Sequence, residues 1–191
     1  MNDLFTQAGW DFMTASANAD SSLDQPTVPV GTPVTPVRKT TKAPVLVIEA
    51  DGGSRGNPGP AAYGVVIKER STMRVRAAFG DYIGIATNNV AEYSGLLAGV
   101  QAALTLRPDA SLDIRLDSQL VIEQMTGGWK IKSPSLRVLA TQVSAALEGV
   151  TASFRWVPRA ANTRADALAN QAMDARAFVG QRPPGPNSET A

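Results

Sequence analysis

Four acidic residues lie at positions in this sequence where a carboxylate is not expected unless it has a functional role. Asp51 and Asp117 directly follow apolar runs typical of strands, and Glu92 and Asp166 lie about one turn into helix-like segments. Because open α/β sheets bind ligands beyond the carboxyl ends of their strands, we expect the four side chains to meet at one sheet edge. Carboxylates packed together repel one another unless a cation neutralises them, and Mg²⁺ or Mn²⁺ prefers such oxygen ligands. The four acids therefore predict a two-ion site suited to phosphodiester hydrolysis.

Each of these acids also has an ordinary structural explanation. Asp51 precedes two glycines and could be only a turn former. Glu92 suits the macrodipole of a helix first turn, and Asp117 could cap the helix that follows it. Asp166 could be a solvated helix charge. The prediction therefore depends on the combination of the four residues in their order and contexts.

The amino-acid composition excludes several classes of catalytic and metal site. The chain has 191 residues, 43% of them hydrophobic, and contains neither histidine nor cysteine. A disulfide framework, the usual zinc sites, a Ser-His-Asp triad and any histidine-dependent hydrolase are thereby excluded. No long apolar span and no secretory signal are evident, so we expect a cytoplasmic protein without a membrane partner.

Charge is nearly balanced but is unevenly distributed. Residues 45–177 carry 14 Lys and Arg against 12 Asp and Glu, a net charge of +2. Without the four proposed metal ligands, the same range carries 14 basic and 8 acidic residues, a net charge of +6. This modest basic excess suits a polyanionic partner.

Residues 44–177 are expected to form one domain between two disordered tails, 1–43 and 178–191. The first tail is rich in Pro and Thr. Its apolar first 13 residues are either a docking segment or a disordered end, and they leave its protein partners open. The domain pattern predicts an α/β fold with a five-stranded mixed sheet flanked by helices, beginning with a hairpin. Strands are expected over 45–49, 61–69, 73–81, 111–116 and 151–157, and helices over 88–106, 118–126, 134–147 and 162–176.

Four sequence segments carry a family resemblance. They are DGGSRGNPGPAAYG, TNNVAE, LDSQLVIEQM with a following GWK, and WVPRAANTRADALAN, which occur in this order from about Val45 to Ala175. Together they resemble type 1 ribonuclease H, and they are especially similar to the ribonuclease H domain of actinobacterial proteins that also carry an acid phosphatase. The phosphatase activity requires histidine, so it is not expected here.

The resemblance implies the ribonuclease H-like three-layer fold and an endonuclease that cuts the RNA strand of RNA–DNA hybrids. Such an enzyme uses two Mg²⁺ ions, with Mn²⁺ as a possible substitute, and leaves 5′-phosphate and 3′-hydroxyl ends. Asp51, Glu92, Asp117 and Asp166 match the family's catalytic and metal-binding acids. The residues implied in substrate binding are Gly52, Gly53 and Ser54 near the RNA strand, Asn57 and Thr87 at a DNA phosphate, and Asn88 and Gln119 in the minor groove.

Two departures from the family pattern concern substrate handling. The loop before the last acid, PRAANTR, lacks the histidine of many members, and Arg159 is the nearest candidate to assist product release or hold a phosphate. The basic handle that some members use is reduced to Trp129, Lys130 and Lys132. Trp129 either lies along a DNA sugar or covers the core edge. We therefore expect weaker hybrid binding with a stronger dependence on salt.

Two other functions remain open at this stage. One is a related nuclease for double-stranded RNA or a Holliday junction, and the other is a non-catalytic hybrid-binding or interaction module. The presence of all four acids argues against the second, since clustered carboxylates without a metal cost stability. The protein is expected to act as a monomer. Asn57, Thr87 and Asn88 also have structural explanations, as a turn residue before Pro58 and as helix caps.

Overall fold

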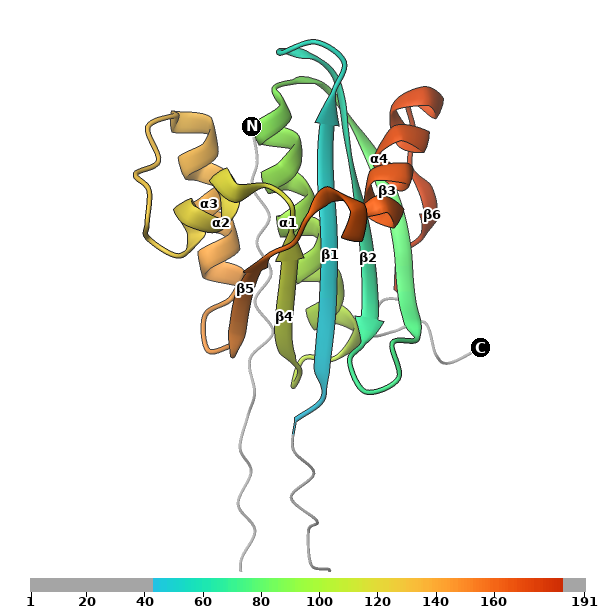
Figure 1. The fold of residues 1–191 in the computed structure, drawn as a ribbon, viewed down its shortest axis with the longest axis vertical. Coiled ribbons are helices and arrows are strands. Elements are labelled where there is room, and N and C mark those ends of the chain that lie inside the picture. The colour runs from blue at the N-terminus through green and yellow to red at the C-terminus, as the bar shows by residue number, and fades with distance from the viewer. Residues whose placement is uncertain (1–42, 184–191) are drawn as a thin grey trace, which may run out of the picture. The chain divides into compact units, whose positions relative to one another are not determined.

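A mixed six-stranded sheet organises residues 43–183, which are the part of the chain that the computed structural model describes. Helices lie on both faces of the sheet (Figure 1). In chain order the elements are β1 (Val45–Ser54), β2 (Gly59–Glu69), β3 (Val75–Ala86), α1 (Asn88–Leu106), β4 (Ser111–Leu116), α2 (Gln119–Met125), α3 (Pro134–Ala146), β5 (Ala152–Trp156), the 3₁₀ helix η1 (Arg159–Ala161), α4 (Thr163–Ala175) and β6 (Val179–Gln181).

The strand order is β5-β4-β1-β2-β3-β6. The pairs β1–β4 and β4–β5 are parallel, whereas β1–β2, β2–β3 and β3–β6 are antiparallel. Ala50 of β1 pairs with Leu116 of β4, and the next residue of each strand is an acid, Asp51 or Asp117. Parallel pairing in this register therefore brings these two carboxylates to the same edge of the sheet.

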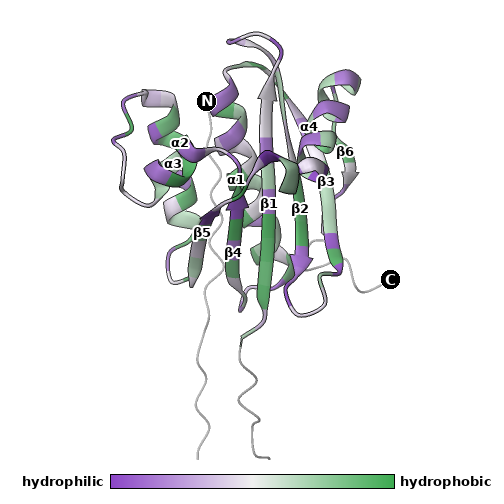
Figure 2. Ribbon diagram, in the orientation of Figure 1, coloured by the Kyte–Doolittle hydropathy of each residue, from purple (hydrophilic) through white to green (hydrophobic). Residues whose placement is uncertain are grey.

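The main core lies between the sheet and α1, together with α2 and α3 on the same face. Leu46, Ile48 and Ala50 of β1 alternate toward this core, as side chains of a strand must, and meet Tyr93 and Leu96 of α1. Figure 2 shows apolar residues along the central strands and polar ones on the outer helix surfaces. Burial of this apolar surface is the main force that holds α1 against the strands.

Helix α4 covers part of the opposite face, over β1, β2 and β3. Two glycines allow its backbone to approach the sheet closely. A Cβ atom at Gly64 would lie 2.0 Å from the carbonyl oxygen of Ala165, and one at Gly80 would lie 2.6 Å from that of Leu168. Glycine is therefore required at both positions, and it places the first turn of α4 beside the end of β1.

The structure corrects the sequence-based prediction at several boundaries, and the strand predicted over 73–81 runs from Val75 to Ala86. The sheet has six strands and not five, because Val179–Gln181 pairs antiparallel with β3. The domain therefore does not end at residue 177, and part of the predicted tail 178–191 is folded. Strand β1 continues to Ser54 through the predicted turn, pairing with β2 as far as Ala61. The predicted tail 1–43 lies almost wholly outside the described residues. None of the helices between residues 43 and 183 combines the length and the hydropathy of a membrane-spanning segment.

Candidate active site

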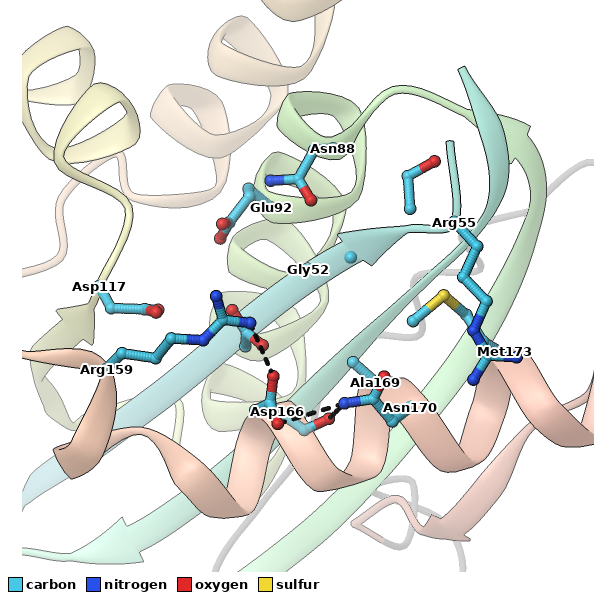
Figure 3. Close-up of a pocket in the computed structure, with 13 residues that line it drawn as sticks. Gly52, Arg55, Asn88, Glu92, Asp117, Arg159, Asp166, Ala169, Asn170 and Met173 are labelled. Carbon is cyan, nitrogen blue, oxygen red and sulfur yellow. Dashed lines mark hydrogen bonds and ion pairs between the residues drawn. The ribbon is translucent and has the colours of Figure 1, made fainter. Parts of the chain in front are cut away.

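One cleft at the carboxyl ends of β1 and β4 contains all four acids that the sequence singled out. The cleft is lined by β1, α1, α4, η1 and the residue after β4 (Figure 3). Of the other predicted site residues, those that line it are Gly52, Gly53, Ser54, Asn88 and Arg159. Residues distant in sequence thus converge here as the strand-end argument predicts.

Three of the acids form a compact cluster. Asp51, Glu92 and Asp117 each offer one carboxylate oxygen such that all three oxygens lie within 4.8 Å of one another. Asp51 is 4% exposed and Glu92 is 7% exposed, so both charges are held away from bulk water. Gly52 makes this possible, since its missing side chain lets β1 touch the backbone of α1 at Glu92.

Burial and mutual repulsion make the carboxyl groups of Asp51 and Glu92 hard to ionise without a cation. Burial first, and then the charges of Asp117 and Asp166, raise the pKa of Asp51 to about 7, although Arg159 opposes the shift. Burial, followed by the charges of Asp51 and Asp117, raises the pKa of Glu92 to about 9. The Oε2 atom of Glu92 is buried and has no hydrogen-bond partner. An all-oxygen donor set with an unpartnered buried oxygen fits a hard divalent cation.

Asn162 holds the carboxylate of Asp117 in place through a hydrogen bond. Its side chain is 1% exposed, and its Nδ2 atom donates to the carbonyl oxygen of Ala50 and to Oδ1 of Asp117, both at 2.8 Å. The indole Nε1 of Trp156 donates to the backbone oxygen of Asp117 at 3.0 Å. One buried amide therefore ties the end of β1, the acid after β4 and the start of α4 to one another. Sequence reasoning did not assign this role to Asn162.

Asp166 stands apart from the three-acid cluster, on the first turn of α4. Its carboxylate accepts from Nη2 of Arg159 at 3.1 Å and from Nδ2 of Asn170 at 3.2 Å (Figure 3). Arg159 itself is 78% exposed at its side chain. The fourth acid is thus held by an arginine that also faces the cleft, and Asp166 lies near enough to Asp51 to raise its pKa.

Three of the residues implied in substrate binding, Asn57, Thr87 and Asn88, gather at the start of α1. Thr87 caps this helix, with its Oγ1 accepting from the backbone N–H of Val90 at 3.3 Å. Oδ1 of Asn57 accepts from the backbone N–H of Asn88 at 3.2 Å. The capping explanation therefore holds for Thr87, and Asn57 binds the same helix end from the β1–β2 loop. Of the three, Asn88 lines the cleft.

Besides Asn57 and Thr87, two further predicted substrate residues, Gln119 and Trp129, do not line the cleft. Gln119 is exposed at the first position of α2, and Trp129 is 49% exposed in the loop between α2 and α3. Their side chains are thus open to solvent, which leaves their proposed substrate contacts as predictions.

The sequence did not single out four residues that line the cleft, namely Arg55, Ala169, Asn170 and Met173. Arg55 forms an ion pair with Asp174. Asn170 and Met173 follow Asp166 by four and seven residues, which is the spacing of one helix face. That spacing was the available signal for the α4 residues. No comparable signal marks Arg55, whose pairing with α4 depends on the tertiary fold.

Comparison with known proteins places this arrangement in a family. The family described as Reverse transcriptase-like matches residues 49–172. The bifunctional protein Rv2228c of Mycobacterium tuberculosis is 53% identical over 133 residues, which cover 69% of this chain and 36% of that protein. The chain thus spans little more than a third of that relative's length. Ribonuclease HI of Halobacterium salinarum is 42% identical over 168 residues, covering 86% of this chain and 83% of the relative.

Solved structures agree with these sequence matches. The N-terminal RNase H domain of the M. tuberculosis protein has a TM-score of 0.66 at 50% identity, covering 70% of this chain and 96% of that domain. The RNase H1 of H. salinarum has a TM-score of 0.66 at 45% identity, covering 69% and 98% of the two chains. Given the fold, the acidic cleft and a relative matched along most of its length, this chain belongs to the type 1 ribonuclease H family.

Proposed function

We propose that this protein is a metal-dependent endonuclease that hydrolyses the RNA strand of RNA–DNA hybrids. The observation that carries the proposal is the cluster of Asp51, Glu92 and Asp117, whose carboxylate oxygens lie within 4.8 Å of one another in a largely buried site. Three carboxylates with so little counter-charge suit cation binding, and the family supplies the reaction class.

The four acids would hold two Mg²⁺ ions, with Mn²⁺ as a possible substitute. Bound there, the ions supply activation of the attacking water and neutralisation of charge on the leaving 3′ oxygen, which yields 5′-phosphate and 3′-hydroxyl ends. Asp51 and Glu92 would contribute buried oxygens and Asp117 a half-buried one, and Asp166 would contribute from the wall formed by α4. Asn162 keeps the carboxylate of Asp117 oriented toward the cluster by donating to its Oδ1 atom.

The end of β1 after Asp51 is suited to close contact with a nucleic acid strand. Gly53 lines the cleft without a side chain, so a nucleic acid backbone can approach there beside the acids. An A-like minor groove is wide and shallow and displays 2′-hydroxyls, which the small polar groups of Ser54 and Asn88 can read. A solved structure of LC11-RNase H1, 35% identical to this chain, is a complex with an RNA/DNA hybrid, which supports the same substrate class.

Arg159 is the proposed substitute for the absent loop histidine. Its guanidinium binds Asp166 at 3.1 Å and remains 78% exposed, so unused N–H donors face the cleft entrance. These donors can hold a phosphate oxygen during product departure. In this role Arg159 contacts the product strand, and its replacement would slow turnover more than it weakens binding of the intact hybrid.

The direct test is cleavage of a labelled RNA–DNA duplex with Mg²⁺ or Mn²⁺, with and without a chelator. RNA and DNA duplexes of the same sequence run in parallel. We expect cleavage of the RNA strand of the hybrid alone, its loss with chelator, and its loss in Asp51→Asn. Preference for the RNA duplex would redirect the proposal to another substrate. Unchanged hybrid cleavage by Asp51→Asn would refute the assignment of the site.

A further inference from the structure

A second charged region lies on the same face of the sheet as α4, outside the cleft. Helix α4 packs on β1, β2 and β3, so within residues 43–183 no helix covers β4 and β5 on this face (Figure 1). Glu49, Arg115 and Arg155 are register partners across β1, β4 and β5, so their side chains stand in a row. We call the residues of this region the basic face: Lys68, Arg70, Arg115 and Arg155, with Glu49 and Asp113 beneath them.

Asp113 is the centre of the basic face. It is 1% exposed, and three arginines converge on it. Nη2 of Arg115 lies 2.8 Å from Oδ2, Nε of Arg155 lies 3.4 Å from Oδ1, and Arg70 also binds Oδ2. The Oδ1 atom is buried and has no hydrogen-bond partner.

One carboxylate cannot accept hydrogen bonds from all the N–H donors of three guanidiniums. Each guanidinium has five N–H donors, roughly fifteen together, against about four acceptor sites on a carboxylate. The side chains of Arg70 and Arg155 are 45% and 55% exposed, so their unused donors face solvent. Lys68 is paired with Glu49 at 2.6 Å. Four cations against two acids leave a net charge of +2 on this face, which favours an anionic ligand with several acceptors.

The basic face is continuous with the cleft. Arg115 precedes Asp117 by two residues and Asp113 precedes it by four, which places them about 7 Å and about 13 Å along the strand from that acid. Arg155 precedes Arg159, which lines the cleft, by four residues. At about 3.4 Å per nucleotide, this path corresponds to roughly two to four nucleotides. A polymer with one phosphate per nucleotide matches this spacing of cations.

We propose that the basic face binds the phosphate backbone of substrate nucleic acid where it runs past the cleft. The inference rests on the proposed function and extends it, by adding a second contact zone for phosphates beyond the site of cleavage. It also gives the chain a replacement for the reduced basic handle between α2 and α3.

The test compares short hybrids, which span only the cleft, with hybrids extended on either side by single-stranded or duplex nucleic acid. Binding is measured in Ca²⁺ or with chelator at several salt concentrations, and cleavage in Mg²⁺. Arg155→Gln and Arg70→Gln should each weaken binding of an extended hybrid about 3- to 10-fold relative to the short one. Each should also reduce the slope of log Kd against log salt by about 1. Arg155→Lys keeps the charge and should restore most of that slope.

Arg107→Gln is the matched control. Arg107 is 49% exposed and pairs with an aspartate, Asp109, but it lies at the end of α1, which packs on the other face of the sheet. The control loses the same charge and should leave the ratio of extended to short binding unchanged. Thermal melts show whether each variant is folded.

The inference is overturned if Arg155→Gln and Arg70→Gln both leave the ratio of extended to short hybrid binding and the salt slope unchanged. The proposed function survives that result as long as the wild-type protein cleaves short hybrids. Tighter binding by these variants would also overturn the inference. That result would indicate that an acidic segment of this chain occupies the face, since residues 1–25 contain four aspartates and no Lys or Arg. Failure of the wild-type protein to cleave any hybrid would instead refute the proposed function.

Discussion

Replacement of Gly52 by alanine should separate the two elements that assemble the acid cluster. A Cβ atom at this position would lie 2.1 Å from the backbone nitrogen of Glu92 and 2.2 Å from the carbonyl carbon of Ala91. Ordinary van der Waals contact begins at about 3.4 Å, so β1 and α1 must move apart by about 1.3 Å. Both contacted atoms belong to the backbone of α1, and no side-chain rotation can relieve the overlap.

The displacement acts directly on the site because the contacted nitrogen belongs to Glu92 itself. A misplacement of about 1 Å in a catalytic group costs roughly 100-fold in rate. Overpacking a dense interior costs about 1–3 kcal/mol of unfolding free energy, which lowers Tm by about 2–4 °C per kcal/mol in a chain of this size. We therefore expect Gly52→Ala to lose about 100-fold in kcat/KM on a hybrid and to melt several degrees lower.

The neighbouring variant Gly53→Ala is the control. A Cβ atom there would meet only Cε of Met173, at 3.1 Å, and a methionine tip can rotate away. Thermal melts should show Gly53→Ala close to wild type, because no backbone overlap drives β1 and α1 apart. A Gly52→Ala protein with wild-type Tm and wild-type kcat/KM would refute the claim that contact between β1 and α1 positions Glu92.

Four further predictions concern charge, support and the last strand. Glu92→Gln should reduce cleavage by more than about 100-fold, as expected for a lost metal ligand, yet raise the Tm of the metal-free protein at pH 9 because it removes a buried charge. The metal-free wild type should lose stability as pH rises. Because the pKa values of Asp51 and Glu92 are raised, the folded state binds these two protons more tightly than the unfolded state does. The protonated acids therefore contribute their full stability below about pH 4, and that contribution is lost as the pH rises through about 7 and 9. Melts from pH 5 to 9 should show that the free energy of unfolding declines by a few kcal/mol and that Mg²⁺ reverses the decline. A Tm that rises over this range without metal would contradict the burial argument. Asn162→Ala should lower the free energy of unfolding by about 1–3 kcal/mol and weaken Mg²⁺ binding in calorimetry about 10- to 100-fold. The control Asn170→Ala should keep the orientation of Asp117, because Asn170 binds Asp166 instead. Arg182→Ala removes contacts with Asp81, Tyr63 and the rings of Phe79 and Phe178, so Tm should fall by a few degrees while the cleavage rate in the same assay stays at wild type.

Local chemistry was sufficient to predict most of the elements. The 3–4 residue spacing of apolar side chains predicted the helix 88–106, which the structure reproduces as Asn88–Leu106. The apolar run before Asp117 likewise predicted 111–116, the observed β4. Periodicity failed where elements are short or their residues unusual. Strand β6 has three residues, too few to show alternation, and the glycine-rich end of β1 forms strand because β2 and α1 accommodate it.

The sequence by itself determined which residues are the acids and that two of them follow apolar, strand-forming runs, because side-chain chemistry and local periodicity are written in neighbouring positions. Only the tertiary structure decided that β1 and β4 are parallel neighbours in a register that brings Asp51 beside Asp117, and that Asp166 pairs with Arg159 outside the three-acid cluster. The same holds for the buried amide of Asn162 and for the three arginines around Asp113. Apart from the contact of Arg115 with Asp113, these contacts join residues 7 to 112 positions apart. Packing and burial of the whole chain select them, which no local pattern encodes.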